Sequence, residues 1–248
     1  RQLKTRRDEI VLGAGLGEDC AILAPGGGEV VLFSSDPVTG TGKDIALYGI
    51  HASANDIAAA GAEPVAVLLT LLLPPDCEER ELKELMAQAE AVCASLHIQI
   101  AGGHTEVTDA VNRIVLTVTA IGRAKEGDTV ATGTAKPGND IVVTKWIGLE
   151  GTSIAAREKE KELLERFPAY LVEEAKGFDK YLSVIPEAAV AGKSGVCAMT
   201  DVTEGGIFGA LWEMAESSGV GLEIDLKSCP SVRKRLKSAI SWISTLMN

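Results

Sequence analysis

Apolar residues in the first half of the chain gather in short continuous runs, separated by segments with a helical spacing. The runs predict strands at residues 20–23, 29–35, 64–73, 98–101 and 113–122. The apolar part of the longest run, 65–73, has nine residues and ends at two prolines. It is therefore predicted to be a buried strand, and it is too short to cross a membrane as a helix.

Two helices are predicted between these strands, at about residues 44–61 and 77–96. The second helix carries apolar residues at spacings of three and four behind Glu-rich turns, at Leu82, Leu85, Met86, Ala89 and Val92. The first helix is rich in Ala and is predicted to stop at Gly61, with Pro64 just beyond it.

The pattern changes after Ala135-Lys136-Pro137-Gly138, which predicts a domain boundary between residues 1–135 and 136–248. Beyond it we expect strands at 141–144 and 196–200, a solvated helix at 157–165, and a helix at 206–217 that buries Ile207, Leu211 and Met214. Strands and helices mix without a long strand-helix-strand alternation. This mixture favours the α+β class.

Three short acidic segments stand beside predicted strands or helix starts. They are Gly17-Glu18-Asp19, Ser35-Asp36 and Asn55-Asp56. Mg²⁺ takes oxygen ligands from a few separated carboxylates and from substrate phosphates, so Asp19, Asp36 and Asp56 together indicate a magnesium site. Taken singly, each segment is equally typical of a surface turn.

Paired glycines follow the predicted strand at 98–101, in the segment Gly102-Gly103-His104-Thr105. Because glycine has no Cβ, backbone amides there can approach and bind phosphate oxygens. A plain turn is the alternative interpretation.

A second phosphate-binding candidate lies in the second domain. Asp201 is predicted to end a strand, Thr203 to cap the following helix, and Gly205 and Gly206 to leave the first amides of that helix open to an anion. An ordinary capped helix explains the same residues. Lys145, at the end of the predicted strand at 141–144, could supply a cation to the site or could be solvated.

Composition narrows the class of protein. The 248 residues carry a net charge of −11 and are 46% hydrophobic. This charge disfavours a nucleic-acid partner, whereas a nucleotide bound through Mg²⁺ remains compatible. Five cysteines without CxxC spacing argue against a disulfide framework and a zinc site. With no membrane-spanning run and no signal peptide at its start, the chain is expected to be a cytoplasmic enzyme.

Six motifs in order carry a family resemblance. They are Gly17-Glu18-Asp19-Cys20-Ala21-Ile22-Leu23, Ser35-Asp36, Asn55-Asp56 through Pro64, Gly102-Gly103-His104-Thr105, Ala135-Lys136-Pro137-Gly138-Asn139-Asp140, and Met199-Thr200-Asp201-Val202-Thr203-Glu204-Gly205-Gly206. Over about residues 9 to 230 the chain resembles the PurM-like superfamily of aminoimidazole ribonucleotide (AIR) synthetase, thiamine-monophosphate kinase, selenophosphate synthetase and the hydrogenase maturation protein HypE. The last motif resembles the Asp-Pro-Thr-Arg-Gly-Gly of HypE.

The resemblance implies a fold and an assembly. The first domain would be a PurM-like α/β unit that pairs with a second copy, through the strands at 65–73 and 114–121, into a dimeric β-barrel-like core. A truncated, ferredoxin-like α+β domain would follow. Both domains would contribute to one ATP cleft.

The resemblance also implies a set of site residues. Mg²⁺ would be held by Asp19, Asp36 and Asp56. The nucleotide would be bound by Gly17, Glu18, Gly102, Gly103, His104, Thr105, Lys145, Asp201, Thr203, Gly205 and Gly206.

The function that follows is Mg²⁺-ATP-dependent phosphoryl transfer, which needs positioning and charge neutralisation more than covalent chemistry. The acceptor is open, either an oxygen or a thio- or carboxamide group, on a small molecule or on a protein terminus as in HypE. Three alternatives stand beside this HypE-like reading: a thiamine-monophosphate-kinase-like small-molecule kinase, a nucleotide-binding maturation scaffold without turnover, and an unrelated structural α+β protein. The sequence identifies no catalytic residue.

The final segment, 231–248, departs from the resemblance. It is basic, and it carries a possible apolar helical stripe of Ile240, Trp242, Ile243 and Leu246. A back-translation of 232–245 read in a shifted frame yields a string like that of HypE relatives. A frameshift, with an incomplete second domain, is therefore one hypothesis for this tail.

Overall fold

The computed structural model describes residues 4–12, 22–23, 26–40, 42–225 and 227–230. The chain divides into two compact units. The first comprises residues 1–130 and 188–196, and the second comprises 131–187 and 197–248. Helix α6 (Ile185–Lys193) is shared between them.

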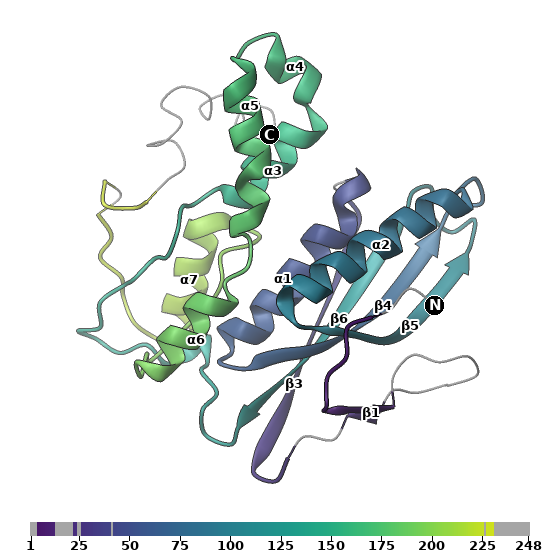
Figure 1. The fold of residues 1–248 in the computed structure, drawn as a ribbon. Helices are drawn as coiled ribbons and strands as arrows, with labels where there is room; N and C mark the ends of the chain where they lie inside the picture. Colours follow the sequence, from purple (N-terminus) through teal and green to yellow (C-terminus); the bar gives the residue numbers. More distant parts are fainter. Residues whose placement is uncertain (1–3, 13–21, 24–25, 41, 226, 231–248) are drawn as a thin grey trace. The chain divides into compact units, whose positions relative to one another are not determined.

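A four-stranded sheet forms the centre of the first unit (Figure 1). Its order is β3 (Glu29–Val38), β6 (Val115–Lys125), β4 (Glu63–Leu73) and β5 (Gln99–Val107). The β3–β6 and β6–β4 pairs are antiparallel, and β4–β5 is parallel. A parallel pair needs a crossover connection, and α2 (Glu79–Leu96) supplies it. A separate antiparallel ladder joins β1 (Ile10–Leu12) to β2 (Ile22–Leu23).

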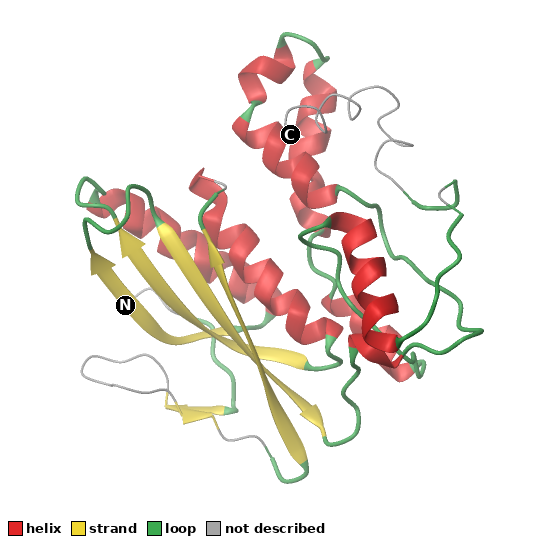
Figure 2. Cartoon of the chain, turned by 180° about the vertical axis from the view of Figure 1, so that it is seen from behind, coloured by secondary structure: helices red, strands yellow, loops and turns green. Residues whose placement is uncertain are grey.

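Two helices cover one face of this sheet, α1 (Ile45–Ala59) and α2, while no described helix of the first unit covers the opposite face (Figure 2). Helix α1 begins after a short 3₁₀ turn, η1 (Gly42–Asp44), and is buried along most of its length. Side chains such as Val67, Val118 and Ile57 fill the space between helix and sheet, each at most 2% exposed. Burial of this apolar layer fixes the height of α1 above the strands.

The predictions for residues 20–122 are confirmed in type. Each predicted strand and helix of this half is present among the described residues. Residues 20–21 of the first predicted strand lie outside them, and the ends of the other elements differ by a few residues. Two differences stand out. Strand β1 was missed because three residues carry no measurable alternation. Strand β5 was predicted to end at Ala101 but continues to Val107, because its backbone pairs with β4 throughout.

The described part of the second unit is helical. It contains α3 (Leu149–Glu158), α4 (Glu160–Leu164), α5 (Ala169–Lys176) and α7 (Gly206–Ser218), with 3₁₀ turns η2 (Thr132–Thr134) and η3 (Gly177–Tyr181). Two small apolar clusters stabilise it, one around Leu149 and Phe178, the other around Ala156 and Leu163.

Several predictions for this half are wrong. The segments 141–144 and 196–200 are irregular, and no strand occurs within 131–225 or 227–230. An extended segment needs a neighbouring strand for its amides and carbonyls, and here Val142 is 83% exposed with none beside it. The helix predicted at 157–165 instead begins at Leu149 and is interrupted at Lys159. Its buried Ala156 and Leu163 show that it is not simply solvated.

The helix predicted at 206–217 is confirmed as α7. Its expected inner residues Ile207, Leu211 and Met214 are only half-buried, and Ala210 is its buried residue. No helix in the described part of the chain is long and apolar enough to cross a membrane.

Candidate metal and nucleotide site

Two of the three predicted metal ligands lie together in the first unit. Asp36 comes from β3 and Asp56 from α1, and the hydroxyl of Ser34 lies between them. Ser34 Oγ is 2.6 Å from Asp56 Oδ2 and 3.3 Å from Asp36 Oδ2. Residues two apart on a strand point to the same face, so Ser34 and Asp36 both face α1.

Helix α1 completes this cluster with a second hydroxyl. Ser53 lies three residues before Asp56, on the same side of the helix. Its Oγ donates to Asp36 Oδ2 at 3.0 Å and lies 3.2 Å from the carbonyl oxygen of Val118. Ser53 is fully buried, so its position is set by packing. The two serines therefore fix how the two carboxylates point.

The arrangement favours a cation. A serine hydroxyl has one proton, so Ser34 donates fully to only one carboxylate at a time. Two half-buried carboxylate groups lie within 3.3 Å of one oxygen atom. Hard carboxylate and hydroxyl oxygens are the donor set that suits Mg²⁺. Among the described residues no group of three or more acidic, His or Cys side chains gathers as a metal centre. The third predicted ligand, Asp19, lies with Gly17 and Glu18 outside the described residues.

The serines were not predicted as site residues. Ser34 precedes Ser35-Asp36 by one position, and Ser53 precedes Asn55-Asp56 by two. The alternation of β3 and the helical spacing of α1 would have placed both on the same faces as the aspartates. That signal was present in the sequence.

The paired glycines lie inside a strand, and the predicted turn is wrong. Gly102 and Gly103 belong to β5, where a register shift leaves Ala101 as an extra residue opposite β4. Gly103 has φ of 144°, and a Cβ there would lie 2.0 Å from the carbonyl oxygen of Leu69. Close approach of two backbones therefore requires glycine at this position, whether or not a phosphate binds.

The sheet register separates these glycines from the carboxylates. Asp36 pairs with Val118, Val118 with Leu69, and Leu69 with Gly103, so the four residues form one row across the sheet. Strands are spaced at about 4.8 Å, which puts Asp36 and Gly103 on the order of 14 Å apart. Within one chain, Gly103 is not a neighbour of the paired aspartates.

The two residues after the glycines are exposed on the outer part of β5. His104 points to the uncovered face, with Nε2 3.9 Å from Glu106 Oε2, and Thr105 alternates to the other side. Neither is held by packing, so both are accessible.

The second-unit candidates are arranged differently from the prediction. Asp201 ends no strand, and Gly205, with φ of 79°, is the N-cap of α7 in place of Thr203. The Thr203 carbonyl accepts the amide of Gly206, and the Thr203 side chain forms no cap hydrogen bond. A left-handed cap needs a glycine, which explains why Thr203 does not occupy it. Asp201 itself is half-buried.

Lys145 is an ion-pair partner within the second unit. Its backbone has φ of 57°, and its Nζ contacts the Ser183 carbonyl and lies 2.9 Å from Glu187 Oε1. The Lys145 side chain is 18% exposed. Its charge is therefore already matched by Glu187.

Comparisons with known proteins show which family the chain resembles along most of its length. The family model of the AIR synthase related protein N-terminal domain matches residues 17–124, and that of the C-terminal domain matches 136–245. Thiamine-monophosphate kinase of Methanospirillum hungatei is 31% identical over 86% of this chain and 70% of its own length. Carbamoyl dehydratase HypE of Rhizobium leguminosarum is 24% identical over 86% of this chain and 61% of its own length.

A solved structure supports the same fold. The crystal structure of hydrogenase maturation protein HypE in complex with ATP superposes with a TM-score of 0.74 at 20% identity, and covers 92% of this chain and 67% of that one. The chain spans 61% to 70% of the length of the two curated relatives.

Proposed function

The chain belongs to the AIR synthase related family, and from that premise we propose that its first unit binds Mg²⁺-ATP and delivers a phosphoryl group to a substrate. The observation that carries the proposal is the Asp36–Ser34–Asp56 cluster. Both carboxylates would hold the metal, and we propose Asp19 as the third ligand. When bound, Mg²⁺ neutralises charge on the phosphate oxygens.

The chain's own residues supply orientation. Ser34 and Ser53 hold the two Oδ2 atoms in place, which prevents the carboxylates from turning away from an incoming phosphate. Preset ligands lower the ordering entropy that binding must overcome. In the second unit, the residues that we propose for nucleotide binding are Lys145, Asp201, Thr203, Gly205 and Gly206, the last two at the glycine-capped start of α7.

A homodimer belongs to this proposal. The uncovered face of the sheet carries Phe33, which is 68% exposed, and mostly small or apolar side chains from its neighbours, at Ser35, Leu68, Thr70, Leu72, Thr117 and Thr119. Such a face suits a second copy of the same sheet. Since Gly103 lies roughly 14 Å from Asp36 in one sheet, we propose that the Gly102–Thr105 segment serves the site of the other protomer.

The acceptor follows the relatives. A HypE-like role, in which a thio- or carboxamide-type group on a protein terminus is activated, is the first candidate. A small-molecule kinase is the second, and the 31% identity to thiamine-monophosphate kinase favours it. A maturation scaffold that binds nucleotide without turnover is the third. The net charge of −11 disfavours a nucleic acid as the substrate.

Thermal denaturation tests the binding step. Mg²⁺-ATP at one hundred times its dissociation constant should stabilise the chain by about 2.7 kcal/mol, while ATP with excess chelator should not. Asp36→Asn and Asp56→Asn should each abolish most of this shift. Asp76→Asn, on an exposed loop, is the matched control and should leave it unchanged. Equal stabilisation by chelated ATP would remove the metal from the proposal.

A turnover assay separates the two candidate acceptors from the scaffold. ADP release with a thiamine monophosphate mixture, or with a peptide bearing a carbamoylated terminal thiol, distinguishes the first two candidates. Binding without ADP release under either condition favours the scaffold.

Light scattering that shows a monomer at micromolar concentration would count against the dimer.

A further inference from the structure

The first residues that the structure describes, 4–12, run along the first unit as a strap with little regular structure of its own. Side chains from other elements accept its backbone amides. Glu90 Oε1, from α2, accepts the amides of Lys4 at 2.8 Å and Thr5 at 2.9 Å. Gln99 Oε1, from β5, accepts the amide of Arg7 at 2.8 Å. The strap is thus held by side chains far away in sequence.

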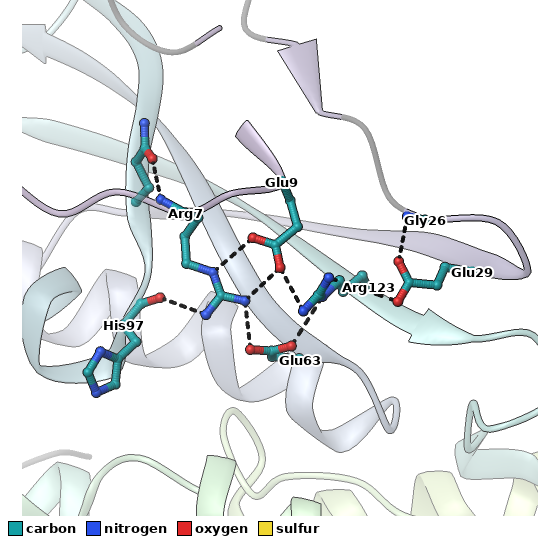
Figure 3. A network of polar contacts seen from close by, with 8 residues as sticks. Arg7, Glu9, Gly26, Glu29, Glu63, His97 and Arg123 are labelled. Atoms are coloured by element: carbon teal, nitrogen blue, oxygen red, sulfur yellow. Dashed lines mark hydrogen bonds and ion pairs between the residues drawn. The ribbon is translucent and has the colours of Figure 1, made fainter. Parts of the chain in front are cut away.

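A network of alternating charges holds the next part of the strap (Figure 3). Arg7 and Glu9 form a two-point pair at 3.0 and 3.1 Å. Arg123, from β6, reaches Glu9 Oε1 at 2.7 Å. Glu63, from β4, accepts from Arg7 at 2.7 Å and from Arg123 at 3.2 Å. Glu29 lies 3.9 Å from Arg123 and closes the outer side.

Burial distinguishes this network from an ordinary surface ion pair. The side chain of Glu9 is 8% exposed, and those of Arg7 and Arg123 are 17% and 30% exposed. A buried carboxylate needs partners, and removing one of them leaves a charge that water cannot solvate. Arg7 belongs to the strap itself. Arg123 is therefore the cation that ties Glu9 to the sheet.

The strap ends in β1. Ile10 packs on the cluster of Val65, Ala66, Ala101 and Ile121, and β1 pairs with β2 through Ile10 and Leu23. In the sequence, the Gly17-Glu18-Asp19 motif connects these two strands. The network around Glu9 thus anchors one side of the β1–β2 ladder to the main sheet.

We propose that Arg123 is a positioning residue that clamps residues 4–12 to the sheet through Glu9, and so holds the β1–β2 ladder in the register that Mg²⁺-ATP binding needs. The second half of this inference rests on the proposed function. The first half, the clamp, does not. Arg123 touches neither nucleotide nor metal in this assignment, and it acts through Glu9 and the strap.

Hydrogen–deuterium exchange of the chain without nucleotide tests the clamp. In Arg123→Met and in Glu9→Gln, the amides of residues 4–7 should exchange on the order of tenfold faster or more, since each variant breaks a charged hydrogen bond. Amides of β4 should keep their protection. Arg123→Lys should keep part of the protection of residues 4–7 that Arg123→Met loses. Arg80→Met removes an arginine that is 76% exposed on α2, and it should change nothing.

A titration tests the link to the site. The Mg²⁺ concentration that gives half of the ATP-dependent thermal shift should rise about tenfold or more in Arg123→Met and stay unchanged in Arg80→Met. A purely structural role would lower the melting temperature without ATP and leave this midpoint in place, which would overturn the positioning role.

The outcomes separate the two proposals. Unchanged strap exchange in both Arg123→Met and Glu9→Gln would overturn the clamp, as would faster exchange spread evenly over β4 and β6. If Arg123→Met fails to fold, the amide exchange of residues 4–7 in Glu9→Gln and Arg123→Lys decides whether the clamp exists. If the wild-type chain shows no Mg²⁺-dependent shift at all, the proposed function fails, while the exchange data still decide the clamp.

Discussion

Gly122 sets the distance between α1 and the sheet, and its replacement by Ala is the sharpest test of how the fold positions the site. A Cβ at Gly122, on β6, would lie 2.2 Å from Cγ2 of Ile57 and 3.1 Å from the carbonyl oxygen of Glu63. Ile57 is 2% exposed and has no room to turn away. Because carbon atoms pack at about 3.5–4.0 Å, α1 must rise locally by about 1.5 Å.

This displacement carries a stability cost and a functional cost. Overpacking of this kind costs about 1–3 kcal/mol. With about 3 °C lost per kcal/mol for a unit of this size, the melting temperature of Gly122→Ala should fall by about 3–9 °C. Asp56 is the residue before Ile57, and its 2.6 Å bond to Ser34 would stretch beyond hydrogen-bonding distance. Loss of this hydrogen bond should also reduce the thermal stabilisation by Mg²⁺-ATP.

Calorimetry with two further variants checks the reasoning. Gly27→Ala, at a position where a Cβ would meet nothing within 4 Å, is the control and should be neutral. Ile57→Leu removes the β-branch that collides, so the double variant Gly122→Ala with Ile57→Leu should recover at least half of the loss. A neutral Gly122→Ala, or a double variant no better than the single, would refute the close approach of α1.

Three other outcomes are expected. Burial raises the pKa of Cys93 to about 12, so in the native chain at pH 8 this thiol should resist alkylation, followed by mass spectrometry, while the exposed Cys197 reacts. Burial alone would raise the pKa of Glu9, but hydrogen bonds and charges from Arg7 and Arg123 outweigh burial, so the net pKa lies below 4.5. The stability that Glu9 contributes is therefore present above about pH 4.5 and is lost as the pH falls through the lowered pKa. Glu9→Gln should make stability less dependent on pH in that range, as measured by acid unfolding. Phe33→Glu, on the uncovered sheet face, should shift the chain from dimer to monomer in light scattering, whereas Tyr170→Glu, equally exposed on α5, should not.

The first half of the fold was predictable because its signals are local. The apolar run that became β4 and the three- and four-residue spacing of α2 each carry enough residues to specify an element. β1 has three residues and exists only through its pairing with β2. The strands expected at 141–144 and 196–200 show the reverse case, since an apolar run without a neighbouring strand has no partner for its backbone.

Half of the cluster formed by Asp36, Asp56, Ser34 and Ser53 was likewise predictable from the sequence. Asp36 and Asp56 were predicted as metal ligands because each is an acidic residue beside a predicted strand or helix. Ser34 and Ser53 were not, although the alternation of β3 and the helical spacing of α1 put each serine on the face of its aspartate. Only the folded structure shows that these two faces meet. Gly103 gave a misleading signal. Glycine is required there because the backbone of Leu69 lies too close for a Cβ, and a pattern along the chain cannot show this contact.

The sheet register links the proposed dimer to the proposed nucleotide site. Val118 and Leu69 stand between Asp36 and Gly103 in one row, and both are buried under the helices. Since these buried residues separate the two groups along the sheet, we propose that Asp36 and Asp56 meet the Gly102–Thr105 segment of the other protomer on one triphosphate. If both groups act in ATP binding, they act from different protomers. Phe33→Glu should then weaken Mg²⁺-ATP binding together with dimerisation, although Phe33 belongs to neither group. A monomeric Phe33→Glu chain with full Mg²⁺-ATP stabilisation would show that the Gly102–Thr105 segment is structural and that Asp36 and Asp56 bind nucleotide without it.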